Sequence, residues 1–224
     1  MSTTATQALA PPANRIPLWV KLIYTAFMAV LIPVYWYYYG PTNFLYFCDA
    51  ALIITLIGIW RESPLLVSMC AVGIIGSQTL WVIDFLSNIV GFPLTHMTDY
   101  MFAADHSLFL RGLSFFHGWL PFFLVYLVWR LGYDTRALLG WALVAWALMF
   151  ISFFFIPGPR PDPGLTPVNI DYVWGLSDTE PQHWMPAIAW FIGMLTIFPL
   201  LLFVPVHFLL RRFMSKPVQG GLTA

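Results

Sequence analysis

Charged residues are scarce in this sequence: they make up 9% of its 224 residues, whereas 60% are apolar or aromatic. A soluble domain carries charge on about a quarter of its residues to coat its surface, so a soluble globular enzyme is excluded. Ten basic residues balance ten acidic ones, which leaves no basic face for nucleic acid. The two cysteines, without a C-x-x-C pair, exclude a disulfide scaffold and a zinc finger. An all-α polytopic membrane protein remains.

Six apolar runs have the length and composition expected of membrane-spanning helices, because a helix needs about 20 apolar residues to cross the hydrocarbon core. The runs are continuously apolar, which favours helices over the alternating pattern of a membrane β-barrel. A transmembrane domain is therefore predicted at 16–212, between a disordered tail at 1–15 and a second tail at 213–224. The predicted spans are about 17–39, 44–60, 64–86, 107–131, 137–157 and 186–210.

The distribution of basic residues predicts the orientation of the chain, because cytoplasmic segments of membrane proteins carry most of the Lys and Arg. With a cytoplasmic N-terminus, eight basic residues lie at cytoplasmic ends, and only Arg111 and Arg160 lie on the outer side. An even number of spans then puts both termini in the cytoplasm and the aromatic run at 36–40 at the outer interface. We expect a multi-pass protein of a bacterial inner membrane.

Two segments on the outer side, 87–106 and 158–185, are long enough to do more than connect helices. The second is rich in proline, aromatic and acidic residues, and such long loops often serve as lids or partner surfaces. The first contains side chains of the types that bind zinc or iron: His96, Asp99, Asp105 and His106. Their loose spacing differs from a compact metal motif such as H-E-x-x-H, so we predict no metal and no cofactor.

Polar side chains on three consecutive predicted helices lie at a similar depth in the outer half of the membrane. Ionisable groups in a membrane are costly and usually face a bundle interior or an aqueous cavity. Steps of three residues place side chains on one helix face. The set comprises Cys48 and Asp49 on the second helix, Gln78, Trp81 and Asp84 on the third, and Arg111, Ser114 and His117 on the fourth. A site in the outer leaflet is therefore predicted.

Nucleophilic acyl transfer is the chemistry that this set favours. Cys48 would attack as a thiolate, and His117 would take its proton and later return it. Arg111 would stabilise a developing negative charge or hold a lipid phosphate. Asp49 or Asp84 would orient His117 or pair with Arg111. This depth suits a substrate with acyl chains in the bilayer and an ester near the headgroups, so membrane lipids are the expected partners.

Structural interpretations of the same residues stay open at this point. Cys48 could be a small packing residue, and His117 could bond a backbone carbonyl or a hydroxyl. Asp84 could be solvated, and Arg111 could pair with Asp84 or Asp105 for structural reasons alone. Trp81 and the aromatic run at 36–40 would then be packing residues and interface anchors.

A non-catalytic membrane subunit or small transporter is the alternative to an enzyme. Such a protein would engage a partner through the outer loop 158–185, and Asp171, Tyr172 and Trp174 would then matter more than Cys48. A transporter would also need a polar path to the cytoplasmic side. The predicted polar residues lie in the outer half only, which disfavours the transporter.

Three stretches within residues 40–130 resemble the YwaF-like integral membrane proteins: NFLYFCDAALIITLIGIW, GIIGSQTLWVIDF and RGLSFFHGWLPFFLVY. That group has a eukaryotic relative, a transmembrane acyltransferase that remodels ether phospholipids through a cysteine acyl-enzyme. The resemblance rests on a cysteine early in one helix and a histidine in a Phe-Phe-His context two helices later. It implies that Cys48 is the acyl-accepting nucleophile and His117 its base. The loop 158–185 has no counterpart in this resemblance.

Overall fold

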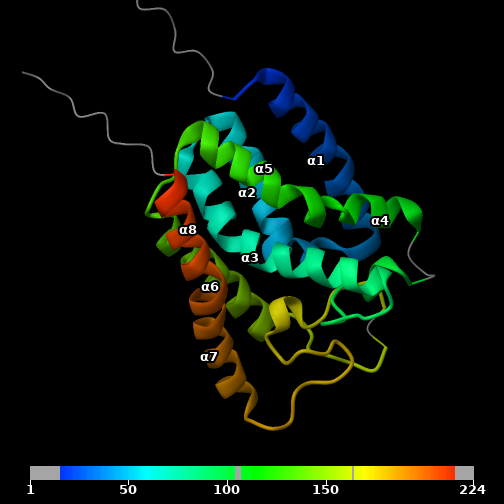
Figure 1. Ribbon diagram of the computed structural model, residues 1–224. Helices are drawn as coiled ribbons and strands as arrows, with labels where there is room; N and C mark the ends of the chain where they lie inside the picture. Colours follow the sequence, from blue (N-terminus) through cyan, green and yellow to red (C-terminus); the bar gives the residue numbers. More distant parts are fainter. Residues whose placement is uncertain (1–15, 104–106, 163, 215–224) are drawn as a thin grey trace, which may run out of the picture.

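The computed structural model describes residues 16–103, 107–162 and 164–214, and this part of the chain is a bundle of helices joined by loops (Figure 1). Five helical stretches are long and apolar enough to cross a membrane, which confirms the predicted class of multi-pass helical membrane protein. They are α1 (Leu18–Tyr39), α3 (Pro64–Ile89), α4 and α5 together (Leu108–Leu131), α6 (Ala137–Phe155), and α7 and α8 together (Ala187–Met214).

The second predicted span, 44–60, is shorter in the structure than a usual membrane helix. Helix α2 runs from Phe47 to Arg61 and has 15 residues. It is preceded by a 3-10 turn, η1 (Pro41–Leu45), since Pro41 lacks a backbone N–H and helps to end the helical pattern of α1 at Gly40. At its other end Glu62 adopts the left-handed conformation, with a φ of 47°, and Pro64 begins α3.

The fourth span, predicted as one helix over 107–131, is broken into α4 (Leu108–Ser114) and α5 (Phe116–Leu131). The His117 side chain explains the break. Its Nδ1 lies 2.8 Å from the Ser114 carbonyl oxygen, which in an unbroken helix would accept from the backbone N–H of Gly118. The backbone N–H of Gly118 donates instead to Phe115 at 3.0 Å, which tightens the turn.

The last span also departs from a regular helix. A π-helical turn (Pro199–Phe203) separates α7 (Ala187–Phe198) from α8 (Val204–Met214). Pro205 has no backbone N–H to donate to the carbonyl four residues earlier, and such gaps are accommodated by wider turns. The helix continues to Met214, four residues beyond the predicted end at 210.

Both ends of the described chain lie at the same end of the bundle. Glu62, just after α2, accepts hydrogen bonds from the Ile16 backbone at 3.2 Å and from Lys21 Nζ at 2.8 Å. After α5, the Tyr133 N–H donates to the carbonyl of Met214 at 3.4 Å. The loops that follow α3 and α6 lie away from both chain ends in Figure 1. These loops carry two further 3-10 turns, η2 (Asp99–Met101) and η3 (Ile170–Tyr172).

Helix α3 is enclosed where it crosses α6. Trp141 of α6 is completely buried and lies directly against Gly73 of α3. The ring of Phe47, the first residue of α2, packs edge-on against Trp141 and against Phe203, with centroid separations of 6.2 and 6.3 Å. The start of α2 is thus fixed by the aromatic core, and this positions the polar residues that follow Phe47.

Candidate functional site

Cys48 and Asp49 occupy the first turn of α2, directly after Phe47. The half-buried Cys48 thiol donates to Asp49 Oδ2 at 3.5 Å. Asp49 is 3% exposed, and its other oxygen, Oδ1, has no hydrogen-bond partner. A buried carboxylate oxygen without a partner is unfavourable in a low-dielectric interior. Its presence indicates that this turn has a role beyond packing. Both cysteines, Cys48 and Cys70, are free thiols.

Asp171, from the loop between α6 and α7, caps the same helix. Its Oδ1 accepts a hydrogen bond from the Phe47 backbone N–H at 3.2 Å, and no side chain local to α2 takes this place. A carboxylate is favourable there because the exposed N–H groups of a helix start carry partial positive charge. Burial raises the pKa of Asp171 well above its usual range; the Phe47 N–H opposes this shift, and the nearby Asp49 adds to it.

Asn169 holds this part of the loop in place. Its Nδ2 donates to the carbonyls of Gly175 and Ser177, each at 3.0 Å, and its Oδ1 accepts from the Trp174 N–H at 2.8 Å. The backbone φ angles at Asn169, Asp171 and Tyr172 are 48°, 56° and 60°, a region that residues with a side chain rarely adopt. The surrounding bonds must offset this strain, which is typical of functional segments.

Several loop residues expected to face a partner point into the protein instead. Asp171 is 7% exposed, and the ring of Trp174 stacks on Phe153 of α6 with centroids 4.3 Å apart. Leu165, Leu176 and Trp184 are large apolar side chains of this loop that remain exposed. A partner bound by the loop would therefore contact other residues than Asp171 and Trp174.

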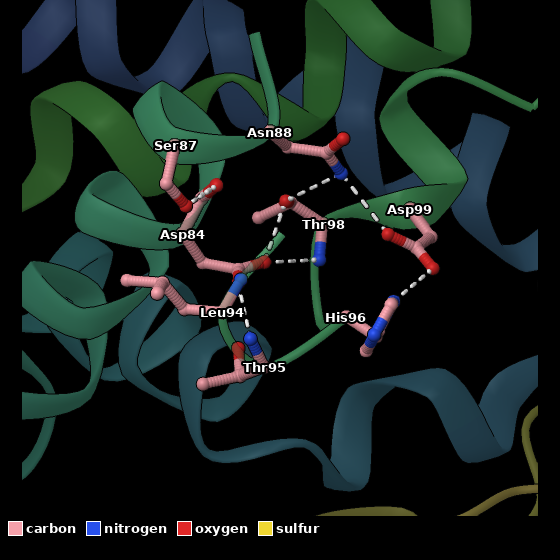
Figure 2. Close-up of polar contacts among 8 residues, drawn as sticks. All are labelled: Asp84, Ser87, Asn88, Leu94, Thr95, His96, Thr98 and Asp99. Carbon is pink, nitrogen blue, oxygen red and sulfur yellow. Dashed lines mark hydrogen bonds and ion pairs between the residues drawn. The ribbon is translucent and has the colours of Figure 1, made fainter. Parts of the chain in front are cut away.

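Asp84 anchors the loop that follows α3, as Figure 2 shows. Its carboxylate accepts four hydrogen bonds, from the backbone N–H groups of Leu94, Thr95 and Thr98 at 3.0, 2.6 and 3.0 Å and from Thr98 Oγ1 at 2.7 Å. Asp84 is therefore neither solvated nor the partner of His117 or Arg111 that the sequence suggested. Arg111 donates instead to the carbonyl of Ala103.

His117 lies against aromatic residues of α3. Its ring centroid is 5.0 Å from that of Trp81, and its Nδ1 bonds the Ser114 carbonyl, as the structural interpretation of this residue expects. With Nδ1 as the donor, Nε2 carries the lone pair and can act as a base. The hydrogen bonds of His117 and Cys48 go to different partners, so the pairing of these two residues stays a prediction.

Two tyrosines missed by the sequence argument complete the polar cluster. Trp81 Nε1 donates to the hydroxyl of Tyr100 at 3.2 Å, and Tyr100 lies near enough to Cys48 and Asp49 for their charges to interact. Tyr35 of α1 shares a 2.7 Å hydrogen bond with Ser114 Oγ. Gln78 is 3% exposed, and its Oε1 lacks a hydrogen-bond partner.

The four loosely spaced residues of metal-binding type, which the sequence does not favour as a metal site, do not form a cluster where they can be placed. His96 and Asp99 make an exposed ion pair, with Nδ1 and Oδ2 2.9 Å apart (Figure 2). Asp105 and His106 lie outside the described residues. Among the residues that the structure does describe, no group of three or more His, Cys, Asp or Glu side chains is arranged to hold a metal.

Comparison with known proteins finds no matching family model, no matching curated protein and no matching solved structure. The resemblance to the YwaF-like proteins therefore stays a prediction. The function has to be argued from the side chains themselves.

Replacing Asn169 by alanine is expected to loosen the loop over α2 and to lower the free energy of unfolding by about 2–3 kcal/mol, because it leaves buried backbone groups unpaired and puts alanine at a positive φ. Asn169→Gly should recover part of this loss, since glycine tolerates that φ. Denaturant titration in detergent measures both, with the exposed Thr179→Ala as the control. Equal stability of all variants would show that Asn169 does not hold the loop.

Proposed function

We propose that α2 is a sixth crossing and that both termini face the cytoplasm of a bacterial inner membrane. The contacts of Glu62 with Ile16 and of Tyr133 with Met214 support an even number of crossings, since they bring both chain ends to one end of the bundle. The basic residues at that same end support its cytoplasmic assignment: Arg61, Arg130, Arg136, Arg211 and Arg212.

We infer that the protein is an acyltransferase or lipid ester hydrolase that uses Cys48 as its acyl acceptor. The observation that carries this inference is the hydrogen bond from the Cys48 thiol to Asp49, in a buried polar cluster beneath two outer loops. Nucleophilic catalysis by cysteine needs a base within reach of the thiol, and the carboxylate of Asp49 meets this requirement. Membrane lipids supply esters at the corresponding depth.

The proposed reaction needs two protein groups: Cys48 carries the acyl group, and Asp49 accepts and returns the proton. The thiol sulfur attacks the ester carbonyl carbon as its proton passes to Asp49, and a carbon–sulfur bond forms. The ester carbon–oxygen bond then breaks, and the leaving alcohol takes the proton from Asp49. Water or an acceptor alcohol next attacks the thioester, gives a proton to Asp49, and releases the acyl group; the sulfur recovers its proton.

Proton transfer and attack are expected to be concerted in this site. A free thiolate is stabilised by nearby cations, whereas Cys48 has the carboxyl groups of Asp49 and Asp171 beside it. A proton that leaves the thiol only as the sulfur attacks needs a base already in contact with it. The hydrogen bond from the Cys48 thiol therefore favours Asp49 over His117 as that base. His117, held by Ser114 next to Trp81, is then expected to contact substrate or the leaving group rather than the thiol.

Intact mass of the protein in lipid nanodiscs tests the proposal. The wild type is expected to gain an acyl mass that hydroxylamine removes, and Cys48→Ala should lose it completely. Asp49→Asn should slow acylation by about 100-fold, the usual contribution of a general base. Cys70→Ala is the matched control, because Cys70 is a buried thiol on α3 that bonds the Ala51 carbonyl at 3.5 Å.

Three outcomes would contradict parts of this proposal. A wild-type protein that neither gains the adduct nor releases fatty acid from any glycerophospholipid offered would overturn the enzymatic function. Full lipid turnover by Cys48→Ala would exclude the cysteine as nucleophile. An Asp49→Asn variant with normal acylation beside an inactive His117→Ala variant would return the role of base to His117.

A further inference from the structure

A groove of about 510 Å³ lies between α1 and α5, toward the end of the bundle that carries both chain ends. Its lining is almost entirely apolar, and six of its eight residues are aromatic. The aromatic residues are Trp19, Tyr24 and Phe27 of α1 and Trp119, Phe123 and Tyr126 of α5. The proposed acyl transfer uses none of them, since Cys48 lies at the end of α2 remote from Glu62.

Contacts among the aromatic rings fix the walls of the groove. Tyr24 and Phe123 stack with ring centroids 5.2 Å apart, and Phe27 meets Trp119 edge-on at 5.1 Å. The Tyr24 hydroxyl donates to the Leu52 carbonyl of α2 at 3.0 Å, so its polar atom bonds the protein rather than a ligand. The groove is therefore preformed, as is usual for sites that bind apolar ligands.

Lipid is the medium beside this groove, because α1 and α5 belong to the membrane-spanning part of the chain. Trp19 and Ile23 are exposed, which leaves the groove open to the bilayer. Water needs polar partners and does not fill an apolar cavity. An unfilled groove would forfeit van der Waals contacts along its walls, so in a bilayer a well-packed hydrocarbon ligand is favoured.

The length and depth of the groove match one acyl chain of a single leaflet. Its wall on α1 extends from Trp19, the second residue of the helix, to Phe27. At the rise of an α-helix these eight steps cover about 12 Å, whereas the hydrocarbon layer of one leaflet is about 15 Å thick. A chain that enters beside Trp19 would thus be covered over most of its leaflet.

The end of the bundle at the mouth of the groove has a positive charge balance. Within the described ranges it carries two acidic residues, and both are paired: Glu62 with Lys21 at 2.8 Å and Asp134 with Arg136 at 2.7 Å. The six basic residues described there are Lys21, Arg61, Arg130, Arg136, Arg211 and Arg212. This balance is complementary to an anionic headgroup.

Arg130 is the basic residue that the helix geometry places at the groove itself. It follows Tyr126 by four residues on α5, so the two side chains lie on one face of the helix, with Arg130 one turn nearer the chain ends. A guanidinium group matches the geometry of a phosphate, to which it can donate two parallel hydrogen bonds. The neighbouring Trp129 is exposed, as expected of an aromatic residue at the headgroup level.

We propose that the groove between α1 and α5 binds an anionic phospholipid from the leaflet on the side of the chain ends. One acyl chain lies between the aromatic walls, and the phosphate is held at Arg130. The site goes beyond the proposed function, because it lies at the other end of α2 from Cys48 and no step of the acyl transfer needs it. An anionic headgroup is expected to bind about fivefold more tightly than a zwitterionic one, the effect of one basic residue near a membrane surface.

Photolabelling of the full chain in phosphatidylcholine nanodiscs tests the site. The probe is a phosphatidylglycerol with a diazirine in one acyl chain, and the labelled residues are located by mass spectrometry of peptides. Labels are expected to concentrate at 19–27 and 119–126, and an excess of unlabelled phosphatidylglycerol should remove them. The exposed Ile192 of α7 reports contact with bulk lipid, which the same excess should reduce much less.

Ile23→Trp and Leu22→Trp form a matched pair of variants. Both residues are exposed on α1, but Ile23 lines the groove and Leu22 does not. A tryptophan at Ile23 fills the entrance, so labelling of 119–126 should fall by about tenfold, the scale of an overpacking penalty. Leu22→Trp should keep the wild-type labelling. Enlarging an exposed side chain leaves the core of the bundle intact in both proteins.

The headgroup is tested by competition between two unlabelled lipids. Phosphatidylglycerol should displace the probe about fivefold better than phosphatidylcholine in the wild type and in Arg212→Gln, a change at an exposed arginine of α8. Arg130→Gln should abolish this preference. Equal competition by the two lipids in the wild type, or an unchanged preference in Arg130→Gln, would overturn the phosphate site at Arg130.

The labelling experiment can fail independently of the proposed function, since it measures no acyl transfer. Cys48→Ala should lose the acyl adduct and keep the label in the groove. Labelling of 119–126 that survives in Ile23→Trp, or that excess phosphatidylglycerol reduces no more than it reduces the label at Ile192, would overturn the lipid site. The role of Cys48 would then stand as it is.

Discussion

Replacing Asp84 by alanine is expected to detach the loop at residues 94–98 and to lower the free energy of unfolding by about 3–5 kcal/mol. Asp84 is 1% exposed and accepts all four of its hydrogen bonds from that loop. Bonds to a charged acceptor are worth about 1.5–3 kcal/mol each, and their loss leaves three backbone N–H groups without a partner. Titration with a denaturing detergent in mixed micelles measures this loss.

Asp99→Ala is the matched control for Asp84→Ala. Asp99 is an aspartate of the same loop region, but its side chain is 54% exposed and bonds the side chains of the exposed His96 and the half-buried Asn88 (Figure 2). Its removal should change the stability by less than about 1 kcal/mol, as expected of surface ion pairs. If Asp84→Ala were no more destabilising than Asp99→Ala, Asp84 would not be the anchor of the loop.

Gly73→Ala is expected to destabilise the bundle by about 3 kcal/mol, although alanine is the better helix former by about 1 kcal/mol. A Cβ atom at Gly73 would lie 1.8 Å from Cε2 of Trp141, far inside van der Waals contact. Trp141 is completely buried and touches Phe47, so its indole cannot move without disturbing the start of α2. The melting temperature in detergent and the rate of the acylation proposed for Cys48 should both fall.

Gly112→Ala provides the matched control for this substitution. Gly112 lies within α4, and a Cβ atom there would meet nothing within 4 Å. The change should raise stability by about 0.5–1 kcal/mol, the helix-propensity gain alone. Equal melting temperatures of the Gly73→Ala and Gly112→Ala proteins would mean that α3 and α6 are not packed as closely as described.

Most helices could be predicted from the sequence, because a run of about 20 apolar residues has few other stable forms in a membrane. Helices α1, α3 and α6 lie within three residues of their expected bounds. The break at Phe115 could not be predicted, since it depends on a histidine side chain that takes the carbonyl of Ser114. A hydropathy pattern does not show whether a side chain or the backbone binds that carbonyl.

The site was predictable only where helices contribute to it. Depth and helical spacing pointed to Cys48, Asp49 and Trp81, but gave no sign of Asp171 or Tyr100. These two reach the cluster through loops whose paths are set by hydrogen bonds from buried polar anchors, Asn169 and Asp84, to the backbone. Asp84 is predicted as a site residue for the same reason. Its spacing on α3 fits such a role, whereas its actual partners lie 10 to 14 residues away in a loop that the spacing does not place.

The shortness of α2 has a consequence for the surrounding membrane. Its 15 residues extend over about 22 Å, whereas a bilayer core is about 30 Å thick. A helix too short for its bilayer causes hydrophobic mismatch, and the lipids beside it adjust by local thinning. With α2 as a crossing, the outer headgroups are drawn inward at the end where Cys48 and Asp49 lie. Under the proposed function, a phospholipid ester would then reach the thiol while the lipid stays in its leaflet, and the deformed bilayer itself would deliver the substrate.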